Sequence, residues 1–211
     1  AQENAWRFSH DKIRESIVAD LQEDELATTH EQVATGLEAL YADDPTQTAK
    51  IGYHWRNSPH PARAIPYTLQ AADYRLNNSD YREALNLLGT AQGLIDRFSS
   101  GSKQRATHEY LLGQAYYGAG NMAASRDHLE AYLSLMNLAK PSPFTLVSQL
   151  FRQLGHRLSI DLFGRRTSWN IQDYGVRAAR AAEQLGQIAY TNNAQIPTVF
   201  YGLQGLNLSE A

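Results

Sequence analysis

The sequence of 211 residues contains no cysteine. This absence excludes disulfide scaffolds, zinc sites built on thiolates and cysteine nucleophiles. Neither sign of charge dominates, because the formal net charge is -3, and this balance argues against direct nucleic-acid binding. No apolar run approaches the roughly 20 residues that a membrane span needs. We therefore expect a cytoplasmic protein whose partners include neither nucleic acid nor a membrane.

Strict alternation of apolar and polar residues, the pattern typical of strands, is nearly absent, whereas helical spacing dominates. Leucines recur every fourth residue from Leu146 to Leu162, beside Phe151, and a second apolar row runs from Tyr81 to Phe98. Such rows place apolar side chains on one face of a helix. Together with the Gly, Pro, Asn and Ser that separate them, they predict an all-α fold with helices at roughly 9–21, 24–41, 46–57, 61–76, 80–97, 103–118, 122–138, 143–161, 168–187 and 195–208.

Two segments carry residues typical of helix starts. Asp44 is followed by Pro45 and Gln47, which predicts a cap at Asp44 and a proline at the first helical position. Asp80 and Glu83 have the spacing of a capping box. The loops between consecutive helices are short, so neighbouring helices are expected to be antiparallel.

Small residues recur 41 and 42 residues apart, at Ala72, Gly113 and Gly155, where they would let paired helices approach closely. The segment from Tyr110 to Asn121 resembles the first helix and turn of a tetratricopeptide repeat, with Gly113, an aromatic residue and a turn glycine at the positions of that pattern. Ser125 stands where the pattern prefers alanine. The resemblance implies an α-solenoid of tetratricopeptide-like antiparallel helix pairs over residues 42–211.

The segment from Trp6 to Ile17 is similar to the end of the winged-helix module in STAND-type signal-transduction ATPases, which precedes tetratricopeptide-like repeats in bacterial adenylate cyclase and LuxR-type regulators. The stretches 30–40, 53–56 and 61–67 fit the same likeness. It implies that residues 1–41 are the C-terminal part of a winged-helix module. Both ends of the sequence look cut, so we expect a piece of a larger protein.

Ser9, His10 and Asp11 contain the residue types of a catalytic triad. Neighbouring helical side chains diverge by about 100°, so a helix cap explains them better and we assign no catalytic residue. The resemblance to STAND ATPases implies instead that His10 lies near the nucleotide phosphates of the full-length parent. ATP or ADP would be a cofactor of that parent only, because this sequence lacks a GxxxxGK[ST] motif. The seven histidines show no spacing typical of metal ligands.

Aromatic and arginine residues are the candidates for an interaction surface, because rigid amphipathic rings and guanidinium groups are common binding hot spots. Packing between helices is the competing interpretation of the same residues. We expect a non-catalytic regulatory region that transmits binding of a protein, peptide, neighbouring domain or small inducer to an ATPase or effector domain. The alternatives are a standalone tetratricopeptide-like scaffold and an enzyme with a site between helices. The candidate surface residues are Tyr53, Trp55, Arg56, Tyr74, Tyr117 and Arg157.

Overall fold

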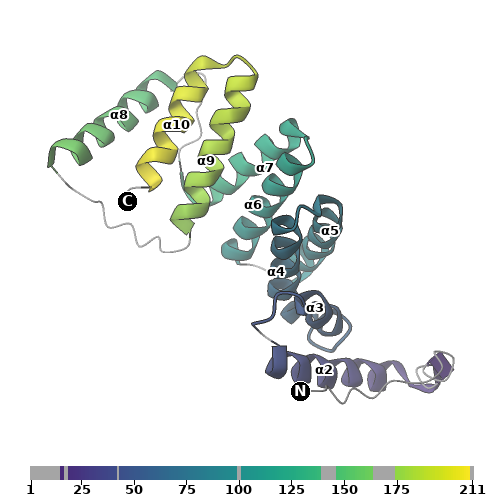
Figure 1. Ribbon diagram of the computed structural model, residues 1–211. Coiled ribbons are helices and arrows are strands. Elements are labelled where there is room, and N and C mark those ends of the chain that lie inside the picture. The colour runs from purple at the N-terminus through teal and green to yellow at the C-terminus, as the bar shows by residue number, and fades with distance from the viewer. Residues whose placement is uncertain are drawn as a thin grey trace, which may run out of the picture. The chain divides into compact units, whose positions relative to one another are not determined.

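A computed structural model describes residues 15–16, 19–41, 43–98, 101–138, 146–163 and 174–209. Within these ranges the fold is all-α and no strand is present, which confirms the all-α part of the predicted fold class (Figure 1). The tetratricopeptide-like solenoid remains a prediction. The predicted helix 9–21 lies largely outside the described residues, and so does His10. The helices are α2 (Glu23–Tyr41), α3 (Thr48–Arg56), the short 3₁₀ helix η1 (Pro61–Arg63), α4 (Ala64–Asn77), α5 (Tyr81–Phe98), α6 (Ser102–Gly118), α7 (Met122–Leu135), α8 (Leu146–Phe163), α9 (Tyr174–Thr191) and α10 (Gln195–Ser209).

The chain forms two compact units, Ala1–Ala71 and Ala72–Ala211. The boundary between them falls inside α4, not at the end of α2, where sequence analysis divides a winged-helix remnant from the repeats. The assignment of 1–41 to a winged helix remains a prediction.

In the first unit, α2 packs against α3, and Glu38 of α2 holds the segment that follows α3. The carboxylate of Glu38 accepts hydrogen bonds from Tyr67 and from Arg63, the latter at 2.9 Å. The Arg63 guanidinium also lies 3.6 Å from the centre of the Trp55 ring, a cation–π contact. α3 buries Ile51 and Trp55, one helical turn apart, and so presents one apolar face to the core.

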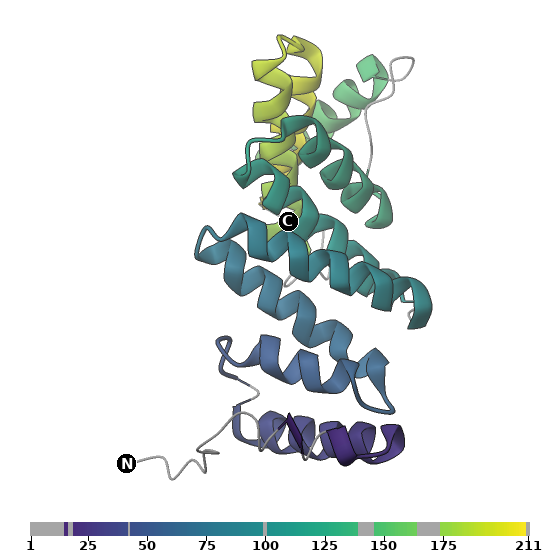
Figure 2. The same ribbon diagram turned by 90° about the vertical axis from the view of Figure 1, so that its right-hand side faces the viewer.

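In the second unit, helices adjacent in sequence pack in pairs, α6 with α7 and α9 with α10 (Figures 1 and 2). The α6–α7 pair meets at Gly113, where an added Cβ would lie 2.5 Å from Cδ2 of Leu129. Ser125 is fully buried in the same contact, and its hydroxyl donates to the Gly113 carbonyl at 2.9 Å. The expectation that Gly113 permits close approach is therefore confirmed.

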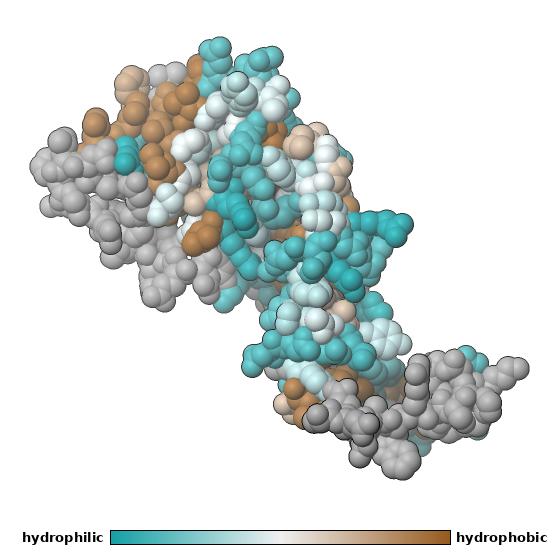
Figure 3. Space-filling view, viewed as in Figure 1, coloured by the Kyte–Doolittle hydropathy of each residue, from teal (hydrophilic) through white to brown (hydrophobic). Residues whose placement is uncertain are grey.

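The same expectation is wrong for Gly155. It is exposed on α8, and an added Cβ there would meet nothing within 4 Å. The leucine row of α8 is likewise not fully buried, because Leu154 and Leu158 are 38% and 57% exposed and the neighbouring Phe151 is 69% exposed. Figure 3 shows hydrophobic residues gathered over α8 and α10. These three side chains thus contribute to an apolar surface.

Some helix ends differ from the predicted bounds, because a single residue there counteracts the helical spacing of apolar residues. α3 starts at Thr48, because the Asp44 carboxylate accepts from the Thr46 N–H at 2.9 Å and hydroxyl at 2.7 Å and so forms a turn. α7 ends at Leu135, before Asn137 in the left-handed region with φ 56°. α9 continues past 187 to Thr191. The predicted cap at Asp80 is confirmed by a 3.3 Å bond from the Glu83 N–H.

Candidate binding groove

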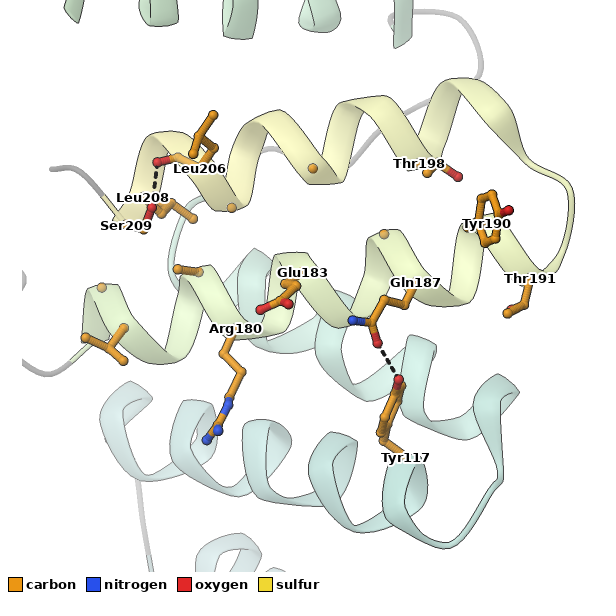
Figure 4. Close-up of a pocket in the computed structure, with 16 residues that line it drawn as sticks. Tyr117, Arg180, Glu183, Gln187, Tyr190, Thr191, Thr198, Leu206, Leu208 and Ser209 are labelled. Carbon is orange, nitrogen blue, oxygen red and sulfur yellow. Dashed lines mark hydrogen bonds between the residues drawn. The ribbon is translucent and has the colours of Figure 1, made fainter.

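A groove of about 1180 Å³ runs along the α9–α10 pair in the second unit. α9 and α10 supply most of its lining, and Tyr117 reaches it from α6 (Figure 4). The Tyr117 hydroxyl donates to the side-chain oxygen of Gln187 at 2.5 Å and so joins the α6 side of the groove to α9. The groove is large enough for several side chains of a bound partner.

Glycines make the close packing of the α9–α10 pair compatible with an open groove. An added Cβ on Gly205 would lie 3.3 Å from the Ala179 carbonyl oxygen, so this glycine serves the contact between the two helices. Gly202 is different, because it is exposed and lines the groove, and a Cβ there would meet nothing within 4 Å. The groove is therefore open at Gly202 for lack of a side chain.

The α9 wall is a row of exposed residues spaced alternately four and three apart. In α9, the alternation of buried and exposed residues sets this row apart, because Ala178, Ala182 and Leu185 are buried on the other side. Spacing of four and three residues places these side chains on one face of the helix. The row consists of Val176, Arg180, Glu183, Gln187 and Tyr190.

The ends of this row are apolar. Val176 is 72% exposed, Tyr190 is 74% exposed, and Leu206 on the α10 wall is 43% exposed. Exposed apolar side chains that gather around a groove are typical of a binding site, whereas scattered ones need no explanation.

The middle of the row carries two opposite charges. Arg180 extends toward α6, and the carboxylate of Glu183 points in a different direction (Figure 4). Among the described residues, neither side chain forms an ion pair, although Arg177, Arg63 and Arg75 each have a carboxylate partner. Arg180 instead hydrogen-bonds the hydroxyl of Tyr110, which lowers the pKa of Tyr110 and partly offsets the larger upward effect of burial. Both residues are exposed, so each charge can also reach a partner in the groove.

A smaller polar pocket of about 330 Å³ adjoins the groove and shares Tyr117 and Arg180 with it. Gln114 and Gln184 face each other in its lining, and two hydrogen bonds of 2.5 and 3.1 Å join their side-chain amides. Asp73, also in the lining, accepts from Arg177 at 3.5 Å. These contacts fix the α6–α9 side of the groove and leave Arg180 at the junction of the two hollows.

The structure places the predicted surface residues in different parts of the chain. Trp55 is fully buried beneath Arg63, so its assignment to an interaction surface is wrong. Tyr53 and Arg56 are exposed, and the Arg56 guanidinium lies 5.6 Å from the centre of the Tyr53 ring. Tyr117 lies in the groove.

Two further candidates do not line the groove. Tyr74 is half-buried in α4 and Arg157 is half-buried in α8. A role for them in binding remains a prediction. The groove residues Arg180, Glu183 and Gln187 were not among the predicted ones, although their spacing on the predicted helix 168–187 is visible in the sequence.

The histidines whose side chains the structure describes pair with each other or with single partners. His30 and His54 lie with their Nδ1 atoms 2.9 Å apart, and His128 lies 2.7 Å from the Glu109 carboxylate. His108 is buried, 3.0 Å from the Leu88 carbonyl oxygen, and burial lowers its pKa. Within the described ranges, no three His, Asp or Glu residues gather as metal ligands.

Comparisons with protein-family models, with curated proteins and with solved structures found no match to this chain. Of the helices in the described residues, none combines the length and apolar character needed to cross a membrane. The groove with its exposed α9 row is the described feature from which we infer a function.

Proposed function

We propose that this chain is a non-catalytic regulatory region of a larger multidomain signalling ATPase and that it binds a protein partner in the α9–α10 groove. Its helix pairs would belong to a tetratricopeptide-like α-solenoid that follows a winged-helix module. The observation that carries the binding role is the exposed α9 row, in which apolar ends flank two charges that lack ion-pair partners in the described residues.

The α6–α7 pair supports the tetratricopeptide-like part of the proposal. In that repeat, a small residue on the first helix lets the second helix approach closely. Gly113 has this role against Leu129, and Ser125 fits the position preferred by alanine because its hydroxyl is satisfied by the Gly113 carbonyl.

The mechanism would be conformational. A partner in the groove can shift the activity of an attached ATPase or effector only if it binds one state of the whole protein more tightly than the other. The α6 residues Tyr117 and Gln114 bond to α9, so they are placed to relay such a difference from the groove to the preceding helix pair.

The complete reading frame and the purified full-length protein test this proposal. We expect a GxxxxGK[ST] motif upstream and binding of ATP or ADP by the full-length protein. Gly202→Trp, which fills the groove, should then change the rate of ATP hydrolysis, whereas Gly89→Trp on α5 should not, because its position is also open but lies outside the groove. A reading frame without the motif would favour a standalone scaffold.

A further inference from the structure

We propose that the ligand of the groove is an amphipathic helix of a partner protein, which places an acidic residue against Arg180 and a basic residue against Glu183. The inference rests on the proposed function and specifies the chemistry of its partner. It is based on the length of the α9 row and its exposed apolar ends, on the charges within that row and on the open position at Gly202.

Both walls of the groove are faces of helices, so a helix can dock between them by packing its own ridges of side chains along their rows. On α10, the groove-lining positions Thr198, Gly202, Gly205 and Ser209 follow each other at the same intervals of four and three.

The length of the row sets the size of the docking helix. Val176 and Tyr190 are 14 positions apart on α9, which corresponds to about 21 Å at 1.5 Å per residue. A partner helix of about 16 residues would span the row and cover both apolar ends. Over Gly202 its backbone can approach α10 closely, because that position has no side chain.

The two charges of the α9 row specify which charged residues the docking helix carries. Arg180 and Glu183 lie three residues apart on α9 and have no ion-pair partner in the part of the chain that the structure describes. An acidic and a basic residue one turn apart on the partner would pair with both at once. Such partly exposed pairs add little affinity each, and they set specificity and register.

Three synthetic peptides of about 16 residues test the inference. They share an alanine-rich helical sequence with leucines on one face and carry Glu and Gln, Lys and Gln, or two Gln at the two charge positions. Binding to the 211-residue chain is measured by fluorescence anisotropy. Both charged peptides should bind about threefold to fivefold more tightly than the uncharged peptide.

Matched variants separate the contributions of the two charges and of the open space at Gly202 to peptide binding. Arg180→Gln should abolish the advantage of the acidic peptide alone, and Glu183→Gln that of the basic peptide alone. Gly202→Trp should weaken all three peptides at least about tenfold, because the indole fills the groove. Gly89→Trp should leave them unchanged, since its Cβ meets nothing within 4 Å and Gly89 does not line the groove.

Several outcomes would overturn the inference. No saturable binding, or binding that Gly202→Trp leaves intact, would exclude an amphipathic helix in the groove. Self-association of the chain that Gly202→Trp abolishes would identify a second copy as the occupant. If the peptides fail to bind while Gly202→Trp still changes ATP hydrolysis by the full-length protein, the ligand class is wrong and the proposed function stands.

Discussion

His30 and His54, on the facing helices α2 and α3, lie with their Nδ1 atoms 2.9 Å apart. A hydrogen bond at this distance needs one nitrogen to donate and the other to accept, so at least one imidazole is neutral. Burial lowers the pKa of His30. It is also the main cause that lowers the pKa of His54, with the charges of His30 and Lys50 acting in the same direction. Tyr53 packs edge-on against both rings.

The first prediction is that the contact between α2 and α3 loses stability in mild acid. The unfolded chain binds protons near pH 6.5, the ordinary histidine value, whereas the folded pair binds them only at lower pH. The contribution of the histidine pair to the free energy of unfolding is therefore complete above pH 6.5. It is lost as the pH falls toward the lower pKa values of the folded state. Thermal unfolding followed between pH 7.5 and about 5 should show this decline.

Replacement of both histidines provides the control for this prediction. His30→Asn combined with His54→Asn removes the pair and should reduce the decline between pH 7.5 and about 5. A residual slope is expected from His108, whose buried ring also has a lowered pKa. An unchanged slope in the double variant would show that the pair does not titrate as its geometry requires.

The second prediction concerns the α6–α7 contact. Gly113→Ala should lower the free energy of unfolding by about 1–3 kcal/mol, because the new methyl group would lie 2.5 Å from Cδ2 and 2.6 Å from Cγ of buried Leu129. Gly89→Ala, in open space on α5, should instead raise it by up to about 1 kcal/mol through helix propensity. Urea unfolding measures both, and a stabilised Gly113→Ala would contradict the packing described at this contact.

The third prediction concerns Tyr67 and Glu38. Burial, with the hydrogen bond and charge of Glu38, raises the pKa of Tyr67 to about 12, against an opposing effect of Arg63. The raised pKa makes a contribution to stability that is complete below pH 10.0 and is lost as the pH rises through about 12. Glu38→Gln should lower the pKa of Tyr67, and an alkaline titration of tyrosinate absorbance measures it.

Tyr67→Phe identifies the tyrosine concerned in that titration. The step near pH 12 should disappear from the absorbance curve of this variant. The late steps of Tyr110 and Tyr201, whose pKa values burial also raises, should remain. If Glu38→Gln leaves the step near pH 12 in place, burial alone sets the pKa of Tyr67 and the carboxylate of Glu38 has no electrostatic role there.

The fourth prediction concerns the attachment of α8 to α10. The Asn207 side-chain amide donates to the carbonyl oxygen of Gln153 at 3.2 Å and to its side-chain oxygen at 2.7 Å. Asn207→Ala removes both bonds in a largely buried position, at a cost of about 1–3 kcal/mol. Hydrogen exchange should accelerate in 146–163 and less so in 174–191. Equal acceleration in both helices would mean that the amide stabilises the whole unit and not this attachment.

Much of the fold could be predicted from the sequence, because helical spacing and turn residues are local signals. The turns at Ser79 and Asn193, which have φ of 60° and 56°, fall at the predicted breaks. Residues that act against the general pattern, such as Asn137 in the left-handed region and Asp44 in its turn, explain the wrong helix ends.

The site was harder to predict, because a site depends on which helix faces meet. Ile51 and Trp55 are spaced as a buried pair, so the burial of Trp55 was visible in the sequence and was outweighed by the general preference for aromatic residues at interfaces. His30 and His54 are 24 positions apart in the sequence, so no local pattern indicates that they are in contact. The α9 row was visible as spacing, but its exposure depends on the packing of α10 and α6.

The open space at Gly202 makes the groove accessible to a single spectroscopic label. The native chain contains no thiol, so Gly202→Cys would introduce a unique attachment point for a fluorophore or spin label in the groove. Gly89→Cys would place the same label in open space on α5. A change in mobility or emission at the first label alone would then report occupancy of the groove in real time.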